Sequence, residues 1–493
     1  MHIPHPERMA RWGWGLLIWG APWSHAAMSV GTGLVTVCSL WAWSRKPTRP
    51  AADSPVLWLA ALLTWQGFSL LWTDQVEWGV KLLSIQLAAV LLAWSWTMVP
   101  LGRDQARQWV FGSAATALTI LLGWGAWQQL QGEALEGRDW TPWMSHIRLA
   151  MFAALGGVWG SRGVPRAWVW AFLGLWGTFT AVTGSFTSAL LWPLSLLWLM
   201  AQEASPQTRR TLTGVAVAFG IAGLGVAAWW LQPIPVDKAS LHTHTALGHP
   251  YTHHPERTVS EGGHRIHLFL CETEWADAWA QVSDVALDAP NSKGFSVRQR
   301  LPRYMTSMGL PKDAEHILQL SPQDVLAIEQ GATNVRPASG LALRMREFKR
   351  EWEVWRDGGS ASGHAVFQRF AHWRAGIWAW SQSWVFGHGV GDTPEAMATA
   401  YDSLESTLSP QHRHRAHMQH LTWGISGGLA ALVLWIGFGW TWWRRIGTIS
   451  SEALWGGVVV GLCCLFEDTL ETQAGVVVAM LALFALASPV SRS

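Results

Sequence analysis

Along most of the chain, apolar residues occur in blocks separated by short polar segments. The blocks are about 17 to 22 residues long, which is the length a helix needs to cross the roughly 30 Å hydrocarbon core of a bilayer. This pattern predicts an all-α polytopic membrane protein with about twelve transmembrane helices, of which the first two can also form one re-entrant pair. The predicted spans are residues 12–26, 28–43, 55–72, 79–97, 108–128, 147–161, 166–183, 186–202, 211–231, 421–443, 453–466 and 473–489.

The composition agrees with a membrane protein. Of 493 residues, 50% are hydrophobic and only 14% are charged, which argues against an ordinary soluble enzyme. The 39 tryptophans point the same way, because an indole ring is favoured at a membrane interface, where its N–H group stays hydrated. No signal-peptide cleavage pattern precedes the first span, so we expect that span to be retained.

The charges of the short loops predict the orientation. Positive residues mark the cytoplasmic side of a membrane protein, and they fall on one side here if both termini are cytoplasmic. These residues are Arg45, Lys46, Arg49, Arg103, Arg107, Arg162, Arg166, Arg209, Arg210, Arg444 and Arg445. The opposite loops are acidic, with Arg138 as their one positive residue, and carry Asp74, Glu77, Glu133, Glu136, Asp139, Glu467, Asp468 and Glu471. This predicts a membrane domain at 1–231, an exported domain at 232–420 and a second membrane domain at 421–493.

The exported insert is predicted to be mostly helical. Residues 232–261, rich in Pro, His and Thr, form a loop, and 264–275 show a strand-like alternation. Helices are expected at 296–310, 321–331, 341–359 and 364–384. The second begins at an N-cap, Ser321, with Pro322 in its first position, and ends at Gly331. The last places one apolar face on Phe367, Phe370, Trp373, Ile377 and Trp380.

Histidines and arginines gather where the insert meets span ten. His417 is a candidate general base, since a neutral imidazole accepts a proton near pH 7; the alternative is an interfacial histidine that only bonds a helix end. Arg369 and Arg374 lie about 140° apart on one helix, so one can bind a phosphate while the other contacts lipid headgroups. Arg303 and Arg415 are further candidates for substrate binding or for headgroup contact.

Arg148 begins an apolar block on the outer side. An ionisable residue in a membrane span is costly and usually faces the interior of the helix bundle or a watery cavity. We therefore regard Arg148 as a functional candidate. The alternative is an arginine that snorkels to the outer headgroups.

Several other motifs favour structural interpretations. The insert begins with a group of histidines without a metal-ligand spacing, so we expect a flexible loop there: His242, His244, His249, His253 and His254. The chain has four cysteines, Cys38, Cys271, Cys463 and Cys464. Only Cys271 lies in the insert, so we expect no disulfide framework there. FGHGVGD, residues 386–392, fits a tight turn and not a phosphate loop. The acidic turn FEDTLETQ, residues 466–473, is expected to be a solvated loop, although it can also orient an arginine or bind a cation. No nucleic-acid-binding pattern is present.

The chain resembles the O-antigen ligase and O-antigen polymerase superfamily of bacterial membrane glycosyltransferases. The resemblance is carried by an Arg-containing helix running into FGHGVGD and by RAHMQHLTWGISGGLAAL, residues 415–432. It is also carried by residues 296–335 and by FEDTLETQAGVV, residues 466–477, which look like a ligase-type subgroup. His417 matches the family histidine that activates the acceptor hydroxyl, and Arg369 the arginine that engages the donor pyrophosphate. Met418 stands where the family often has Asn, and TGSFTSAL, residues 183–190, lacks a family arginine that Arg148 can replace.

The resemblance implies a ligase in the bacterial inner membrane, with its large loop in the periplasm. The donor would be a glycan on undecaprenyl pyrophosphate, the acceptor a lipid A core sugar or another glycan, and the reaction would need neither metal nor cofactor. Membrane lipids are the remaining expected partners. A polymerase and a protein O-glycan ligase remain alternatives, as do a polysaccharide transporter and a non-catalytic assembly protein.

Overall fold

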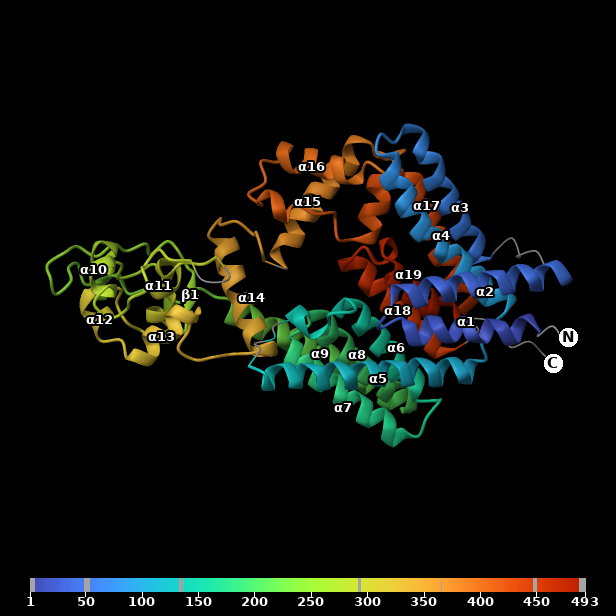
Figure 1. Cartoon of the computed structure of the whole chain (residues 1–493), viewed down its shortest axis with the longest axis horizontal. Coiled ribbons are helices and arrows are strands. Elements are labelled where there is room, and N and C mark those ends of the chain that lie inside the picture. The colour runs from blue at the N-terminus through green and yellow to red at the C-terminus, as the bar shows by residue number, and fades with distance from the viewer. Residues whose placement is uncertain are drawn as a thin grey trace. The chain divides into compact units, whose positions relative to one another are not determined.

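The structure is a computed structural model that describes residues 5–47, 54–132, 135, 137–290, 294–364, 366–446 and 450–486. Arg49, Glu133 and Glu136, which contribute to the predicted orientation, lie outside the described residues, as do the side chain of Arg138 and positions 487–489 of the predicted last span. Nineteen helices and one two-stranded sheet are present in the described part of the chain. The chain forms two compact units: unit 1 is Met1–Ala216 with Gln368–Ser493, and unit 2 is Val217–Phe367 (Figure 1).

Among the described residues, six helices are long and apolar enough to cross a membrane, which suggests a multi-pass membrane protein. They are α2 (His25–Arg45), α3 (Pro55–Phe68) with the 3₁₀ turn that extends it to Trp72, α4 (Val76–Met98), α5 (Arg103–Leu130), α9 (Pro206–Trp230) and α17 (Gln419–Ile446).

The other six predicted spans also form helices, but these are shorter or less apolar, so the structure does not show twelve spans. They are α1 (Pro6–Gly20), α6 (His146–Gly160), α7 (Arg166–Thr183), α8 (Phe186–Glu203), α18 (Ser451–Phe466) and α19 (Gln473–Phe484). α1, α6, α18 and α19 have 12 to 16 residues and measure about 18 to 24 Å along their axes, less than the roughly 30 Å of a bilayer core. α7 and α8 have 18 residues each but are less apolar than the six long helices.

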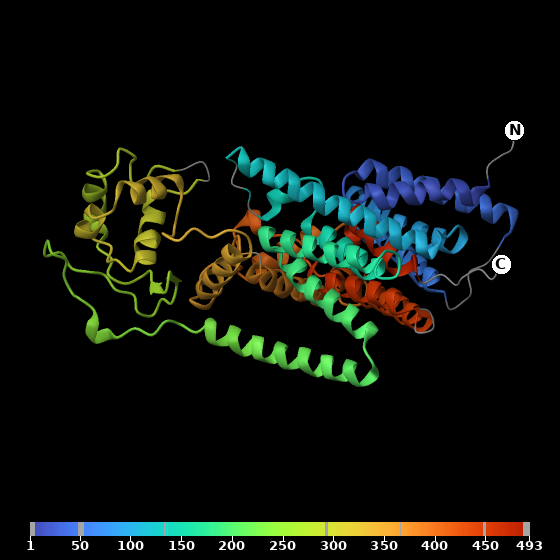
Figure 2. The ribbon, with the colours of Figure 1, turned by 90° about the horizontal axis from the view of Figure 1, so that it is seen from below.

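Two helices form the centre of unit 1. In α6 every residue from Ile147 to Gly160 is buried, and in α19 every residue from Ala474 to Phe484. Apart from Arg148 of α6, these buried residues are apolar or glycine on every side of both helices, and such helices are stable only inside a larger assembly. α5, α8 and α18 pack against α6, while α4 and α18 pack against α19 (Figures 1 and 2). The first turn of α6 and the loop before α19 therefore occupy the interior of one helix bundle.

α17 is broken at Gly428, and the glycine-rich turn fills the break. Gly428 has φ of 63° and a Cβ there would lie 2.2 Å from the carbonyl oxygen of Val385, so glycine is needed. The backbone amides of His388 and Gly389 donate to the carbonyls of Ile425 and Ser426, at 2.8 and 3.0 Å. The predicted tight turn is thus confirmed, and its amides satisfy carbonyls that the kink releases.

α15 (Phe367–Gln382) confirms the helix predicted at 364–384, but its predicted apolar face is only partly buried. Its buried side runs through Gln368, His372 and small residues such as Ala375. Of the predicted face, Phe367 is buried, whereas Phe370 and Ile377 are exposed. The close-packed side of the helix thus carries mainly small and polar groups. α16 (Thr393–Ser403) follows after the glycine-rich turn.

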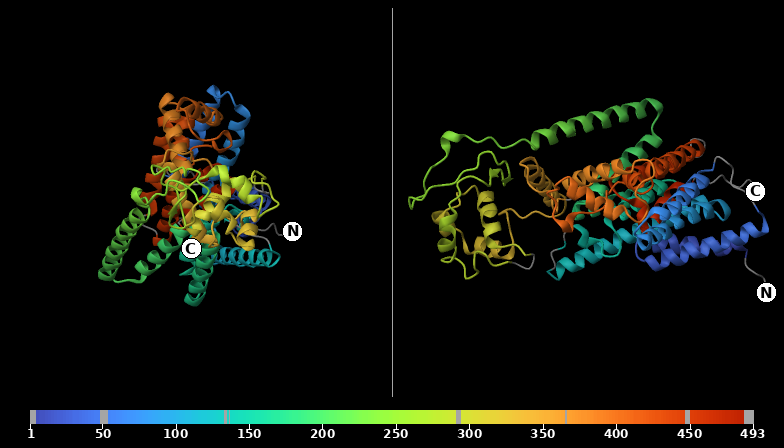
Figure 3. Two further views of the ribbon diagram at one scale, coloured as in Figure 1. Left: turned by 90° about the vertical axis from the view of Figure 1, so that its left-hand side faces the viewer. Right: turned by 90° about the horizontal axis from the view of Figure 1, so that it is seen from above.

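Unit 2 has its own small apolar core, built from residues of α10 (Trp275–Trp279), α11 (Val297–Met308), α12 (Ala314–Leu318) and α13 (Pro322–Gln330) (Figure 3). The predicted ends of α13 are confirmed: Ser321 forms a capping box with Asp324, and Gly331 closes the helix with φ of 110°. α14 (Gly340–Arg356) matches the helix predicted at 341–359. The strand expected at 264–275 is confirmed only for His264–Arg265 (β2), which pairs with Ser260–Glu261 (β1). The prediction is wrong for the rest of this stretch, where the apolar residues lie mostly in turns.

Candidate functional site

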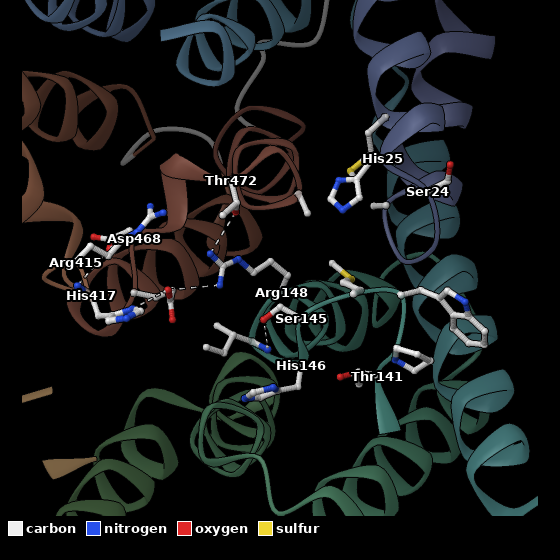
Figure 4. A pocket seen from close by; sticks show the side chains of 18 residues that line it. Ser24, His25, Thr141, Ser145, His146, Arg148, Arg415, His417, Asp468 and Thr472 are labelled. Carbon is white, nitrogen blue, oxygen red and sulfur yellow. Dashed lines mark hydrogen bonds and ion pairs between the residues drawn. The ribbon is translucent and has the colours of Figure 1, made fainter. Parts of the chain in front are cut away.

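A polar cluster lies in unit 1 where four segments meet. Arg148 comes from the first turn of α6, Arg369 from α15, and Arg415 and His417 from the loop before α17. The fourth segment joins α18 to α19 and carries Glu467. Figure 4 shows Arg148 and His417 beside a pocket of about 520 Å³, with Arg415 and Asp468 behind them. Three of the six predicted site residues thus line one cavity.

Glu467 joins the predicted groups to one another. Its carboxylate lies 3.2 Å from Nδ1 of His417, 3.5 Å from Nη2 of Arg369 and 4.0 Å from Nη1 of Arg148. Burial alone would raise the pKa of Glu467, but the His417 hydrogen bond and the two arginine charges outweigh it and lower this pKa to about 2. Glu467 is therefore ionised at any physiological pH.

His417 is held in a fixed orientation by two carboxylates. Its backbone has φ of 50°, a left-handed conformation that costs an L side chain about 1–2 kcal/mol. Its backbone N–H donates to Asp468 at 3.2 Å, and its ring Nδ1 faces Glu467. Because ionised Glu467 can only accept, Nδ1 carries the hydrogen. The neutral ring then has its lone pair on Nε2, as a general base requires.

A second histidine packs against His417. The ring of His372 lies 5.3 Å from the His417 ring, centre to centre. Burial, and then the neighbouring His417, lower the pKa of His372 to about 3, so this ring stays neutral. The Tyr401 hydroxyl donates to the carbonyl of His414 at 2.8 Å, so Nδ1 of His372 donates to that hydroxyl at 2.6 Å. His372 thus supports His417 without adding charge.

Arg148 lies inside the bundle and does not snorkel outward. It is only 5% exposed and donates through Nη2 to the hydroxyl of Thr472 at 3.2 Å, besides facing Glu467. Thr472 is the N-cap of α19, so a helix at the buried centre of unit 1 positions this contact. The placement agrees with the expectation that an arginine in a membrane segment faces the bundle interior or a cavity.

The two arginines of α15 have separate environments, as their spacing predicts. Arg369 points into the cluster, and its Nη1 is buried without a hydrogen-bond partner among the described residues. One turn further along, the indole N–H of Trp373 is buried and also lacks an acceptor there. Arg374 is exposed, and within the described chain no ion pair joins it to the cluster. Of the two arginines, Arg369 is therefore the one that brings a buried, unmatched donor to the site.

The acidic turn is buried, so the expectation of a solvated loop is wrong. Asp468 and Glu471 are 2% and 8% exposed. Arg415 pairs with Glu471 and has its Nε 3.9 Å from Asp468, and Thr422 donates to Asp468 at 2.6 Å. Burial raises the pKa of both carboxyls in spite of Arg415, helped by the charge of Glu467 for Asp468 and by the charge of Asp468 for Glu471. The alternative role in orienting an arginine is the one that the structure supports.

The remaining predicted residue, Arg303, belongs to unit 2 and is not part of this cluster. Its Nη2 lies 2.8 Å from Glu261, which is buried, and Asn334 donates to the same carboxylate at 2.8 Å. This contact ties α11 to β1. The structure therefore gives Arg303 a role in holding unit 2 together.

A cluster of charged residues around Glu452 lies at the opposite ends of α6 and α18. Glu452, fully buried, accepts two hydrogen bonds from Arg107, at 3.0 and 2.7 Å, and Arg162 lies 3.8 Å away. Arg148 and Arg162 are separated by 14 residues, or roughly 20 Å along a helix. Arg107 and Arg162 are among the positive residues that predicted the cytoplasmic side. The acidic turn thus lies at one end of these helices, and Arg162, together with Arg107 of α5, lies at the other.

The far side of the pocket is lined by Ser24 and His25 at the start of α2 and by Thr141, Trp143 and His146 before and within α6. Figure 4 shows Ser24, His25 and Thr141 on the side of Arg148 away from His417. The cavity therefore has a cationic end with a lone-pair imidazole, and an end with hydroxyls, imidazoles and an indole. Such a lining suits an anionic group at one end and a hydroxylated group at the other.

No protein-family model matches this chain, and a comparison with curated proteins gives no match. The site is therefore defined by its geometry alone. The residue that sequence reasoning missed is Glu467, which contacts three of the predicted groups. The sequence did contain a signal for this residue, because the acidic turn is predicted to lie on the same outer side of the membrane as the candidate arginines and His417.

Proposed function

We propose that the protein is a ligase-type glycosyltransferase that moves a glycan from undecaprenyl pyrophosphate to a hydroxyl of a lipid A core sugar. The observation that carries the proposal is the contact of His417, Arg148 and Arg369 with one carboxylate beside a 520 Å³ pocket. A proton acceptor next to several guanidinium groups suits attack by a hydroxyl on a carbon whose leaving group is a pyrophosphate.

The charge balance of the cluster supports an anionic donor. Arg148, Arg369 and Arg415 bring three positive charges to face the three carboxyls of Glu467, Asp468 and Glu471, and burial together with the Asp468 charge raises the pKa of Glu471 to about 8, so that Glu471 holds a proton near pH 7. The cluster therefore keeps an excess of positive charge, which attracts anions into a confined site. Arginine forks also bind phosphate oxygens in a bidentate manner and stay charged at any physiological pH.

In the proposed reaction, the acceptor oxygen attacks the anomeric carbon of the donor sugar and a new glycosidic bond forms. The acceptor proton moves to Nε2 of His417, and Glu467 stabilises the imidazolium through Nδ1. The bond between the anomeric carbon and the pyrophosphate oxygen breaks, and undecaprenyl pyrophosphate leaves with the electron pair. Arg369 and Arg148 stabilise the charge on that oxygen, and His417 then loses its proton to solvent.

The proposed setting is the periplasmic face of the bacterial inner membrane, with about twelve spans. The six long apolar helices support a multi-pass protein, and the shorter apolar helices α6, α18 and α19 pack within the same unit. The acidic turn lies at the ends of these helices opposite to Arg107 and Arg162. If positive loops are cytoplasmic, the pocket opens toward the periplasm.

Replacement of His417 by Ala tests the reaction. Loss of a general base typically lowers a rate by about 10²–10⁴-fold. The matched control is His412→Ala, because His412 lies in the same loop and the backbone carbonyl that it offers to Gln368 is kept in the variant. Transfer is measured with purified protein, lipid-linked glycan and a lipid A core acceptor. Equal rates for His417→Ala and wild type would refute the proposal.

Deletion of the gene separates the related activities. Loss of polymer from lipid A, with polymer accumulating on undecaprenyl pyrophosphate, supports the ligase. Single repeats on lipid A would indicate a polymerase, and loss of glycan from proteins a protein ligase. Unchanged glycans on both carriers, together with normal transport, would contradict a glycosyltransferase.

A further inference from the structure

A second polar cluster lies in unit 2 and brings together three kinds of metal ligand. Donor atoms of His249, Cys271 and Glu274 all lie within 4.8 Å of one another. Cys271 and Glu274 are 3% and 5% exposed, while the His249 side chain is 55% exposed. The cluster is thus buried on one side and open to solvent on the other.

The local fold explains why residues so far apart in the sequence meet. Thr252 and Leu270 form an antiparallel bridge with two backbone hydrogen bonds of 2.7 and 3.1 Å, which joins the histidine-rich loop to the segment before Cys271. The short 3₁₀ helix Glu272–Glu274 then turns the Glu274 carboxylate back toward the loop. His249 reaches it, with Nδ1 2.8 Å from Oε1.

The Glu274 carboxylate is fixed by further contacts. The Thr245 hydroxyl donates to its Oε1 at 2.6 Å, and the backbone N–H of Ala314 donates to its Oε2 at 2.7 Å. The Cys271 sulfur lies beside this carboxylate and 3.4 Å from the hydroxyl of Thr273. A buried carboxylate held by outer partners next to a thiol is an arrangement that metal sites use to orient their ligands.

We propose that His249, Cys271 and Glu274 bind a Zn²⁺ ion, independently of the proposed transferase activity. Sulfur, imidazole and carboxylate are the ligand types that zinc accepts, whereas Mg²⁺ and Ca²⁺ require oxygen ligands. Zinc bonds of about 2.0–2.3 Å place tetrahedral ligands about 3.3–3.8 Å apart, so the most distant pair must approach by about 1 Å. Rotation of the exposed His249 side chain can supply much of that movement.

Binding of Zn²⁺ would replace one hydrogen bond and release one proton. The ion takes the place of the hydrogen between Nδ1 of His249 and Glu274, and the neutral ring then carries its hydrogen on Nε2. The Cys271 thiol loses one proton to solvent and binds as a thiolate, so binding weakens as the pH falls. A water molecule on the open side supplies the fourth ligand. The ion would clip the histidine-rich loop to the core of unit 2.

The test uses the full-length protein in detergent micelles, freed of metal with a chelator and titrated with Co²⁺ as a spectroscopic substitute for Zn²⁺. We expect one equivalent of Co²⁺ to produce a sulfur-to-cobalt charge-transfer band that Zn²⁺ then removes. Cys271→Ser should abolish the band, and His249→Ala should weaken binding by about tenfold or more, since loss of even an outer partner costs 10–100-fold.

His254→Ala is the matched control, because His254 lies in the same loop but pairs with Glu256 outside the cluster. It should bind Co²⁺ as wild type does. Since the His249 side chain is largely exposed, its replacement should leave the fold intact, which circular dichroism checks. No band in wild type, or a band that survives in Cys271→Ser or is as weak in His254→Ala as in His249→Ala, would overturn the proposal.

Discussion

Replacing Glu467 by Gln is the most direct test of the cluster in unit 1, because one carboxylate contacts His417, Arg148 and Arg369. Gln keeps almost the same shape and retains one oxygen that can accept the Nδ1 hydrogen, but it carries no charge. In the proposed reaction His417 becomes positively charged as it accepts the acceptor proton. The substitution therefore removes the charge that stabilises the imidazolium in the transition state.

The distance between Nδ1 of His417 and the Glu467 carboxylate sets the expected loss of rate. At 3.2 Å, two unit charges attract each other by about 5 kcal/mol in a medium of effective dielectric constant 20. This is an upper bound, since the side chains of His417 and Glu467 are 26% and 14% exposed and water screens them. The retained hydrogen bond reduces the loss further. We expect a cost of about 2–3 kcal/mol, or about 30- to 150-fold in rate.

The assay is single-turnover transfer by purified protein at saturating donor, so that binding and product release do not limit the rate. The matched control is Glu452→Gln, which removes a buried carboxylate paired with arginine at the other end of α18. It should lower thermal stability but leave the rate per folded molecule near wild type. A Glu467→Gln rate within about twofold of wild type, or an equal loss in Glu452→Gln, would refute the argument.

Two further predictions concern the same cluster. Arg369→Ala should lower the transfer rate by about 10²–10³-fold, because it removes a donor to the leaving oxygen. Arg374→Ala on the same helix should leave the transfer rate within about twofold of wild type. Equal effects of the two substitutions on kcat would contradict the assignment. Burial, then the Asp468 charge, raise the pKa of Glu471 from its usual 4.5 to about 8, so the folded state holds a proton that the unfolded chain releases. The contribution of Glu471 to stability in detergent should therefore be fully present below pH 4.5 and be lost as the pH rises to about 8, by at most about 1.4 kcal/mol per pH unit. Glu471→Gln should flatten this dependence, and an unchanged slope in pH-dependent thermal unfolding would show that another group causes it.

Local signals in the sequence were sufficient for helix ends and turns. Ser321, Pro322 and Gly331 predicted the bounds of α13, because capping depends on residues within one turn of the helix end. The glycines of FGHGVGD likewise predicted a turn, since Gly387 and Gly389 have φ of 75° and 103°. What the sequence did not reveal was the partner of that turn, the break in α17 at Gly428.

The environment of the acidic turn could not be predicted from local pattern. Glu467, Asp468 and Glu471 stand between two apolar segments, as residues of a solvated loop also do. Their burial depends on arginines that come from α6, α15 and the loop before α17. The same limit applies to His249, whose partners Cys271 and Glu274 are more than twenty residues away. In both clusters the chemistry is decided by long-range packing.

The two ends of α18 differ in a way that bears on function. Glu452 gives both of its oxygens to Arg107, so that guanidinium is matched by a bidentate partner. Glu467 divides its two oxygens among His417, Arg148 and Arg369, and Nη1 of Arg369 has no acceptor among the described residues. A purely structural ion pair has no reason to leave a buried guanidinium donor unmatched, because such a donor costs free energy. Under the proposed function, a pyrophosphate oxygen that reaches Arg369 beside Glu467 would supply the missing acceptor, and this property distinguishes a binding site from a structural pair.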